Sequence, residues 1–161
     1  MEAQTDAEDE NNVRSLYNTL LENWNSQNAS AFANLFARNG IAIGFDGSQM
    51  IGLQEIYDEI SKVFSSHKVS TYVGIVREVR ALSTTVFLLH SVAGMVPPEE
   101  SKINPDVNAV QILIAKKDQG KFRIAVYQNT PAAFHGRTEL SQQLTEELQE
   151  AFNNQPKKTS T

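Results

Sequence analysis

The stretch FARNGIAIGFDGSQMIGLQEI, residues 36–56, combines a strand, a tight turn and the beginning of a helix. A strand is predicted over residues 41–45, and Asp46-Gly47 is a strong signal for a hairpin turn into a short return strand. Gly52 then opens a helix whose apolar side chains recur at helical spacing. The stretch therefore predicts a β-hairpin followed directly by an amphipathic helix.

Two helices are predicted before this stretch. Ser30 is placed to cap the second, short one, and Asn39-Gly40 to end it. Residues 1–9 are small, polar and acidic, so we expect them to form a disordered arm ahead of the first helix. That first helix is amphipathic because its apolar residues follow the i, i+3, i+4 spacing: Val13, Leu16, Tyr17, Leu20, Leu21 and Trp24.

The pattern after the third helix changes to long strands. Strands of this length exceed the usual five or six residues, so we expect them to bend or bulge. Gly74 and Gly94 are the expected places for the bends. The predicted strands cover residues 69–81, 85–96, 107–117 and 121–130.

Two of these strands are apolar on both faces, at residues 86–89 and 109–114. An antiparallel strand with one face in water should alternate apolar and polar residues instead. We therefore expect one face of the sheet to pack on the helices. We expect the outer face to contact a second copy of the chain, which makes a homodimer the predicted assembly.

The element order predicts an α+β fold, in which three helices from the N-terminal half pack on one face of a mixed, mainly antiparallel sheet. An extra C-terminal helix is expected over residues 138–152, with a narrow apolar stripe. The predicted organisation is one domain over residues 10–131, a linker and packed helix over 132–153, and a flexible tail over 154–161. The stripe is spaced by four and consists of Leu140, Leu144, Leu148 and Phe152.

Composition excludes several classes of protein. The length of 161 residues fits a single domain. The formal net charge is -5, and Lys and Arg never occur in runs longer than two, so we expect no nucleic-acid partner. The absence of cysteine excludes disulfides, thiolate zinc sites and a cysteine nucleophile.

Membrane and cofactor signals are also missing from the sequence. The longest apolar stretch, around residues 86–96, is broken by His90 and Ser91, and the N-terminus does not resemble a signal peptide. We therefore expect no membrane partner and a cytoplasmic location. The three histidines lie on different predicted elements without metal-ligand spacing, and nucleotide-binding glycine motifs are absent. We expect no metal and no cofactor.

His90 is the strongest ionisable candidate for a catalytic residue, because it interrupts an apolar strand. As a general acid or base it would face a cavity. The alternative, which we favour, is a histidine held by hydrogen bonds in the core or in a dimer interface. Asp46 is interpreted as a turn residue and not as a catalytic base.

An uncharged polar set is predicted to line a ligand pocket. Counting outward from the turn at residues 118–120 places Lys117 opposite Lys121 and Gln111 opposite Tyr127, with Asn129 further along. Small residues beside uncharged polar ones suit a cavity wall, although a partly wet dimer interface explains them equally well. The same alternation places Ala109, Arg123 and Ala125 on this face. Trp24 and Tyr57, which carry a polar atom on an aromatic ring, are expected to border the pocket, and His90 completes the predicted set.

The chain resembles the SgcJ/EcaC branch of the NTF2-like superfamily, which is related to SnoaL-like and DUF4440-type proteins. Four pieces carry the resemblance: the opening helix ending in Trp24-Asn25, residues 36–56, the pair of long strands around His90, and KFRIAVYQNTP at residues 121–131. It covers about residues 10–131. It implies a cone-shaped curved sheet, a cavity between sheet and helices, and frequent dimerisation through the outer sheet face.

Relatives with this fold include ketosteroid isomerase-like enzymes, polyketide cyclases, dehydratases, and members that only bind or assemble, so the resemblance leaves function open. In the isomerase-like pattern the base lies near the end of the first strand, where this chain has Gly44. We favour binding of a small, largely apolar molecule. The alternatives are an acid/base enzyme of the cyclase, isomerase or dehydratase type using His90, and an assembly module like the calmodulin-dependent kinase association domain.

Overall fold

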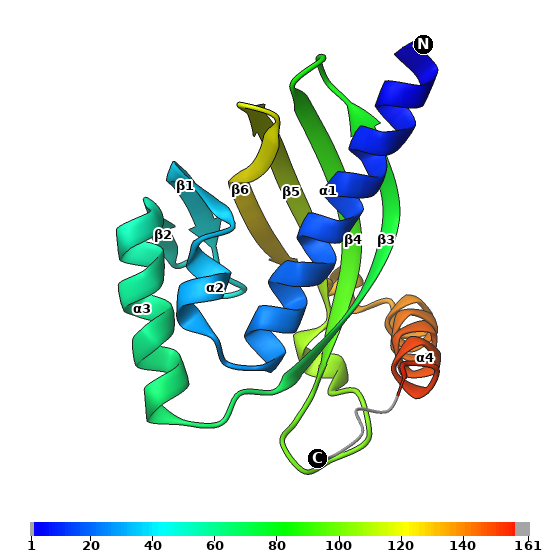
Figure 1. Cartoon of the computed structure of the whole chain (residues 1–161). Helices are drawn as coiled ribbons and strands as arrows, with labels where there is room; N and C mark the ends of the chain where they lie inside the picture. Colours follow the sequence, from blue (N-terminus) through cyan, green and yellow to red (C-terminus); the bar gives the residue numbers. More distant parts are fainter. Residues whose placement is uncertain (1, 157–161) are drawn as a thin grey trace.

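The computed structural model describes residues 2–156 (Figure 1). A six-stranded sheet has the order β2-β1-β6-β5-β4-β3, in which β1 and β6 are parallel and the other neighbours are antiparallel. The predicted α+β architecture with an extra C-terminal helix is confirmed. The elements are α1 (Glu2–Asn25), α2 (Ala29–Ala33), β1 (Phe36–Ile43), β2 (Gln49–Ile51), α3 (Leu53–Ser66), β3 (Thr71–Ala81), β4 (Val86–Val96), η1 (Pro105–Val107), β5 (Ala109–Asp118), β6 (Lys121–Pro131), η2 (Phe134–Gly136) and α4 (Thr138–Asn153).

Helix α1 crosses one face of the sheet, here called the inner face, and α2 and α3 lie beside it near β1 and β2 (Figure 1). The apolar stripe of α1 is buried against inward-facing side chains of β4 and β5. Each large apolar side chain that is fully buried stabilises the fold by roughly 1.5–3 kcal/mol. The fully buried members of this core include Val13, Tyr17, Leu20, Phe87, Leu89 and Leu113.

Gly74 permits close contact between β3 and α1. A Cβ atom at this position would lie 2.6 Å from Leu21 Cδ1 and still closer to the Tyr17 hydroxyl. The irregularity of β3 occurs instead between Val76 and Glu78, where the register with β4 shifts. The expected bend at Gly74 is therefore replaced by a nearby bulge, and the glycine serves helix packing.

The N-terminal residues differ from the sequence prediction. Residues 2–9 of the expected disordered arm belong to α1, which begins at Glu2, while residue 1 lies outside the described residues. Asp9 is only 4% exposed and accepts a hydrogen bond from Lys117 Nζ at 3.1 Å. That ammonium group also lies 5.7 Å from the centre of the Phe122 ring. Because extending an existing helix adds one hydrogen bond per residue, this anchor favours helix at the preceding residues.

Strand β1 begins earlier than predicted. Helix α2 ends at Ala33, capped by Asn34, and Phe36 already pairs with Ile124 of β6. The register shifts between Phe36 and Ile41. Gly40 lies inside this irregular segment, where a Cβ atom would be only 2.7 Å from the Ile124 carbonyl oxygen. The glycine thus permits strand pairing and does not end a helix as expected.

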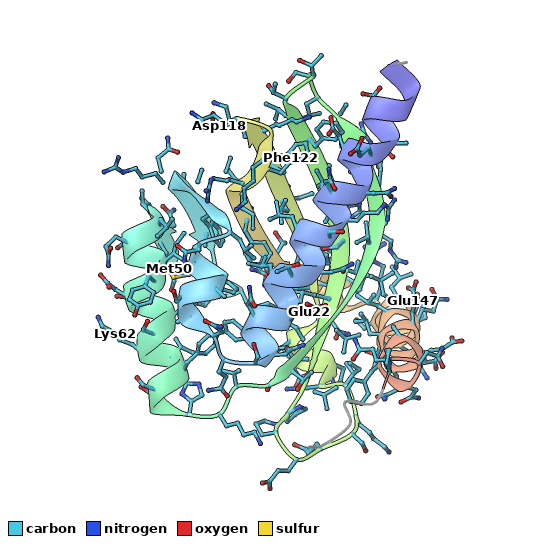
Figure 2. All side chains as sticks on the ribbon, in the orientation of Figure 1. Glu22, Met50, Lys62, Asp118, Phe122 and Glu147 are labelled. Atoms are coloured by element: carbon cyan, nitrogen blue, oxygen red, sulfur yellow. The ribbon has the colours of Figure 1, made fainter. Side chains whose placement is uncertain are left out.

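Helix α4 covers part of the outer face of the sheet, opposite α1. Leu144 and Leu148 pack there on β3 and β4, and a Cβ atom at Gly94 would lie 2.9 Å from Leu148 Cδ1. Arg77 of the β3 bulge binds Glu147 (labelled in Figure 2) through both terminal guanidinium nitrogens, with Nη2 to Oε1 at 2.6 Å. Asn108 Nδ2 donates to Thr145 Oγ1 at 2.9 Å.

The expected flexible tail falls mostly outside the described residues. Asn154 caps α4, and residues 157–161 are not described. Within residues 2–156, none of the helices combines the length and the apolar character needed to span a bilayer.

Candidate functional site

A cavity of about 490 Å³ lies between the inner face of the sheet and helices α1, α2 and α3. Its walls are mainly apolar and aromatic, and Met50, labelled in Figure 2, lies in the wall near α3. The lining residues are Leu21, Trp24, Phe32, Ala42, Ile43, Gly44, Phe45, Asp46, Ser48, Gln49, Met50, Glu55, Glu59, Ile60, Val63, Tyr72, Met95, Val107, Ala109, Tyr127 and Asn129.

Trp24 forms one aromatic wall of the cavity. Its ring centre lies 5.3 Å from both Phe64 and Tyr72, in edge-to-face arrangements, and 6.2 Å from Phe32. The indole Nε1–H donates to the Ser70 carbonyl at 3.0 Å. Because its polar atom is already bonded to the protein, Trp24 presents an apolar surface to the cavity.

Strand β3 is fixed to the end of α1 by a reciprocal pair of hydrogen bonds. Asn25 Nδ2 donates to the Tyr72 carbonyl at 3.1 Å, and the Tyr72 backbone N–H donates to Asn25 Oδ1 at 2.7 Å. The two bonds resemble the paired backbone hydrogen bonds between neighbouring strands, and they hold Tyr72 beside Trp24.

Tyr127 and Asn129 form one end of the cavity, here called the inner end. A buried polar network lies behind this end, with Gln111 of β5 at its centre. Gln111 Oε1 accepts hydrogen bonds from Tyr17 Oη at 2.5 Å and Ser91 Oγ at 3.1 Å. Gln111 Nε2 donates to Tyr127 Oη at 2.7 Å and Asn129 Oδ1 at 2.8 Å. Tyr17, Ser91 and Gln111 are fully buried, and the amide of Gln111 uses both of its acceptor and both of its donor positions. The network fixes Tyr127 and Asn129 in the cavity wall.

The strand register differs from the predicted one. The turn has two central residues, Gln119 and Gly120, both with positive φ, so Asp118 pairs with Lys121. A second shift, between Ile114 and Ala115, adds a residue to β6, and Gln111 therefore faces Asn129 and not Tyr127.

The extra residue in β6 also changes which side chains share a face. Tyr127, Asn129 and Ala109 lie on the inner face, as predicted, and all three line the cavity. Arg123 alternates with the buried Phe122 and Ile124, so it lies on the opposite face. Arg123 and Ala125 are not cavity residues, contrary to the prediction.

The predicted site residues are only partly brought together. Trp24, Tyr127 and Asn129 line the cavity, and Gln111 lies directly behind the last two. Tyr57 is 39% exposed on α3 and does not line the cavity, so its predicted place is wrong.

His90 lies on the outer face of the sheet, and its predicted place in the cavity is also wrong. Its neighbours Leu89 and Ser91 are fully buried on the inner face, and side chains alternate along a strand. On the outer face His90 is flanked by Glu78 and Ile112. A catalytic role inside the cavity is therefore excluded for this side chain.

Three carboxylates line the cavity, namely Asp46, Glu55 and Glu59, whereas none of the lining residues is a lysine, arginine or histidine. Asp46 Oδ1 accepts from the Ser48 N–H at 2.9 Å, and this bond lowers the pKa of Asp46. Glu55 Oε2 accepts from the Ile51 N–H at 2.7 Å. All three residues are exposed, and Glu59 Oε1 pairs with Lys62 Nζ at 3.2 Å, so these carboxylates lie on the solvent-exposed side of the cavity.

Glu55 and Glu59 were not among the predicted site residues. They are four residues apart and therefore lie on one side of α3, next to the inward-facing Ile56 and Ile60. That spacing was a usable sequence signal, because positions flanking an apolar stripe border whatever the stripe faces.

The tyrosines of the cavity are neutral hydrogen-bonding groups. Burial raises the pKa of Tyr72 to about 12, although a hydrogen bond from the neighbouring Tyr127 hydroxyl opposes this shift. Burial also raises the pKa of Tyr127 well above its usual value. Both phenols keep their hydrogens at neutral pH, so the inner end can bind polar atoms but does not supply a base.

Metal binding has no geometric support within residues 2–156. No group of three or more His, Cys, Asp or Glu side chains in this part of the chain is arranged to hold an ion.

Comparisons with known proteins establish the fold. No family model and no curated protein matches the sequence. A domain of unknown function with a cystatin-like fold from Nostoc punctiforme has a TM-score of 0.70 at 19% identity, covering 86% of this chain and 93% of that one. A putative scytalone dehydratase from Novosphingobium aromaticivorans has a TM-score of 0.68 at 10% identity, covering 81% and 88%. An NTF-2 like protein of unknown function from Shewanella oneidensis has a TM-score of 0.63 at 14% identity, covering 74% and 97%.

The chain therefore has the NTF2-like, cystatin-like fold. At sequence identities of 10–19%, these similarities establish the fold and not the function, since proteins of one fold differ widely in function.

Proposed function

We propose that this chain binds a small, largely apolar molecule in the cavity between its sheet and helices. The observation that carries this proposal is the composition of the cavity: aromatic and aliphatic walls, with Tyr127 and Asn129 held rigidly at the inner end. A volume of about 490 Å³ falls within the roughly 300–1,000 Å³ of known ligand sites. Few, well-oriented polar groups in an apolar pocket are typical of ligand recognition.

An acid/base enzyme is less well supported. A solved structure with this fold is named a putative scytalone dehydratase, but His90, the candidate base here, lies on the other face of the sheet. Asp46 has a lowered pKa and is a turn residue, which makes it a weak base. Proton abstraction needs a base with a pKa closer to neutrality. Membership of the SgcJ/EcaC branch stays a proposal that rests on the sequence resemblance.

A ligand screen by thermal shift tests the proposed function. A ligand present at 100 times its Kd stabilises the folded state by about 2.7 kcal/mol, which raises the Tm of a protein of this size by about 5–10 °C. We expect uncharged bicyclic or tricyclic compounds to give such shifts. A screen in which no such compound raises the Tm would contradict the proposal.

A homodimer through the outer face is a second proposal, supported by a separate observation. Leu88, Ile112 and Ile114 form a continuous apolar surface on β4 and β5, because Leu88 pairs directly with Ile114. Helix α4 packs on the β3–β4 part of this face and contacts neither Ile112 nor Ile114 in its apolar cluster. A twofold axis through such a surface would bury it against its own copy.

Light scattering after size exclusion tests the dimer. We expect twice the chain mass for the wild type and a monomer for Ile112→Lys, whose charge would be buried in the interface. A wild-type monomer at tens of micromolar protein contradicts the dimer without affecting the ligand proposal. A larger assembly would favour the association-module hypothesis instead.

A further inference from the structure

A backbone carbonyl determines the direction of the whole polar network. The Ile43 carbonyl oxygen can only accept hydrogen bonds, so the group of Asn129 that lies 3.1 Å away must be its Nδ2. Asn129 Oδ1 therefore faces Gln111, and the group of Gln111 at 2.8 Å must be the donor Nε2. The orientation of both amides follows from one carbonyl on β1.

The orientation of Gln111 then assigns a role to each hydroxyl group around it. Tyr17 and Ser91 face Oε1, so both must donate. Tyr127 faces Nε2 at 2.7 Å, so its oxygen accepts and its own hydrogen is directed away from Gln111.

Several hydrogens at the inner end of the cavity are consequently not used by this network. The Tyr127 hydroxyl hydrogen and the second hydrogen of Asn129 Nδ2 take no part in the bonds just described. The Tyr72 hydroxyl is a third donor in the same wall. Because the Tyr127 hydroxyl donates to Tyr72, the Tyr72 hydroxyl hydrogen is the one of this pair that is left for a ligand. The inner end of the cavity is therefore rich in donors.

Charge restricts the kind of acceptor that can meet these donors. The lining includes Asp46, Glu55 and Glu59 but no cationic side chain. A ligand carboxylate or phosphate beside Tyr127 and Asn129 would enter a largely apolar space in which none of the lining side chains is cationic, which is unfavourable. An uncharged oxygen has no such cost.

We propose that the ligand is a neutral, largely apolar molecule with a carbonyl oxygen or a comparable acceptor, which accepts a hydrogen bond from the Tyr72–Tyr127 pair. This inference rests on the proposed function and adds the chemical class of the ligand. Gln111 acts as a positioning residue: because it makes Tyr127 an acceptor on one side, the Tyr127 hydroxyl can donate to Tyr72, and the Tyr72 hydroxyl can then donate to a ligand.

Matched probes test the ligand class. Decalin, 2-decalone and decahydro-2-naphthoate share one bicyclic skeleton and differ in their polar group. Trp24 is the only tryptophan of the chain and lines the cavity, so its fluorescence reports binding directly. We expect the ketone to bind about 3- to 10-fold more tightly than the hydrocarbon, as one added hydrogen bond predicts, and the carboxylate to bind most weakly.

Removing the hydroxyl groups should remove the preference for the ketone. In Tyr72→Phe combined with Tyr127→Phe, we expect decalin and 2-decalone to bind with equal affinity. Tyr72→Phe alone serves as the milder variant, because the Tyr72 hydroxyl makes no bond to Gln111. Tyr57→Phe is the matched control, since Tyr57 does not line the cavity, and it should keep the wild-type preference. The affinity for decalin, which has no polar group, is the control in each variant: an affinity equal to that of the wild type shows that the cavity is intact.

The outcomes separate this inference from the proposed function. If no probe changes Trp24 fluorescence in the wild type, the proposed function fails. If decalin and 2-decalone bind the wild type equally, if the double variant keeps the preference, or if the carboxylate binds best, only the ligand class is overturned.

Discussion

The Tyr17 hydroxyl of helix α1 donates a 2.5 Å hydrogen bond to Gln111 Oε1 in the centre of the sheet. The two residues are 94 positions apart in the chain and are both fully buried. Through this bond the packing of α1 is connected to the orientation of Tyr127 and Asn129 in the cavity wall.

Gln111→Leu should destabilise the protein by about 2–4 kcal/mol. The substitution keeps the approximate size of the side chain but leaves the hydroxyls of Tyr17 and Ser91 and the Asn129 carbonyl without their partner in the core. Urea unfolding monitored by Trp24 fluorescence measures the change. Gln54→Leu, on the exposed side of α3, is the control and should change stability by less than about 0.5 kcal/mol. Equal stability of the two variants would show that the network contributes nothing.

Gly74→Ala should destabilise the fold by about 1–3 kcal/mol, because the new methyl group would overlap Tyr17 and Leu21. Gly44→Ala is the matched control, since the nearest atom to its Cβ would be Asp46 Oδ1 at an ordinary 3.4 Å. Thermal unfolding of both variants checks the prediction. A Gly74→Ala protein as stable as wild type would contradict the close packing of α1 on β3.

The ion pair between Arg77 and Glu147 should make the packing of α4 depend on pH. The hydrogen bonds from Arg77 lower the pKa of Glu147 below its ordinary 4.5. A lowered folded-state pKa means that the pair stabilises the protein above about pH 4.5 and that this contribution is lost as pH falls through the folded-state value. Both side chains are more than one-third exposed, so we expect only about 0.5–1 kcal/mol.

Glu147→Gln measures this contribution. The variant should have a lower Tm than wild type at pH 7, and this difference should shrink as the pH falls through the lowered folded-state pKa of Glu147. A difference in Tm that stays the same over the whole pH range would assign the effect to packing and not to charge.

Asp9 and Lys117 should hold the first turns of α1 on the sheet. Asp9→Ala removes a hydrogen bond between charged, mostly buried groups, and we expect a loss of about 1–3 kcal/mol. Amide hydrogen exchange should become faster at residues 6–12 but not at residues 16–24, which pack on the core through Leu20 and Leu21. A double-mutant cycle with Lys117→Met should give a coupling of about 1 kcal/mol. Additive effects, or unchanged exchange, would contradict the anchor.

The sequence was sufficient for the order of the elements but not for the faces of every strand. Alternation could not place His90, because residues on both sides of its strand are apolar and either face could have been the inner one. Tyr57 follows the buried Ile56 by one position, which rotates its side chain about 100° away from the core. The helical spacing of the sequence was therefore sufficient to predict that the Tyr57 side chain points away from the core.

The register of β5 and β6 depended on local geometry that the sequence pattern did not reveal. The choice between a two-residue and a three-residue turn at Gln119-Gly120 shifts the register by one, and the bulge in β6 shifts it again. Tyr127 and Asn129 were nevertheless placed on the correct face, because the two shifts of one residue add up to two and so restore their alternation relative to Gln111.

Titration of Trp24 fluorescence with 2-decalone, in the wild type and in Ala109→Leu, tests the central claim most directly. Ala109 lines the cavity, so the larger side chain should occupy ligand space while far-UV circular dichroism stays unchanged. The account predicts a saturable change in the wild type and at least about tenfold weaker binding in the folded variant. No saturable change in the wild type, or equal affinity in both proteins, would contradict binding in this cavity.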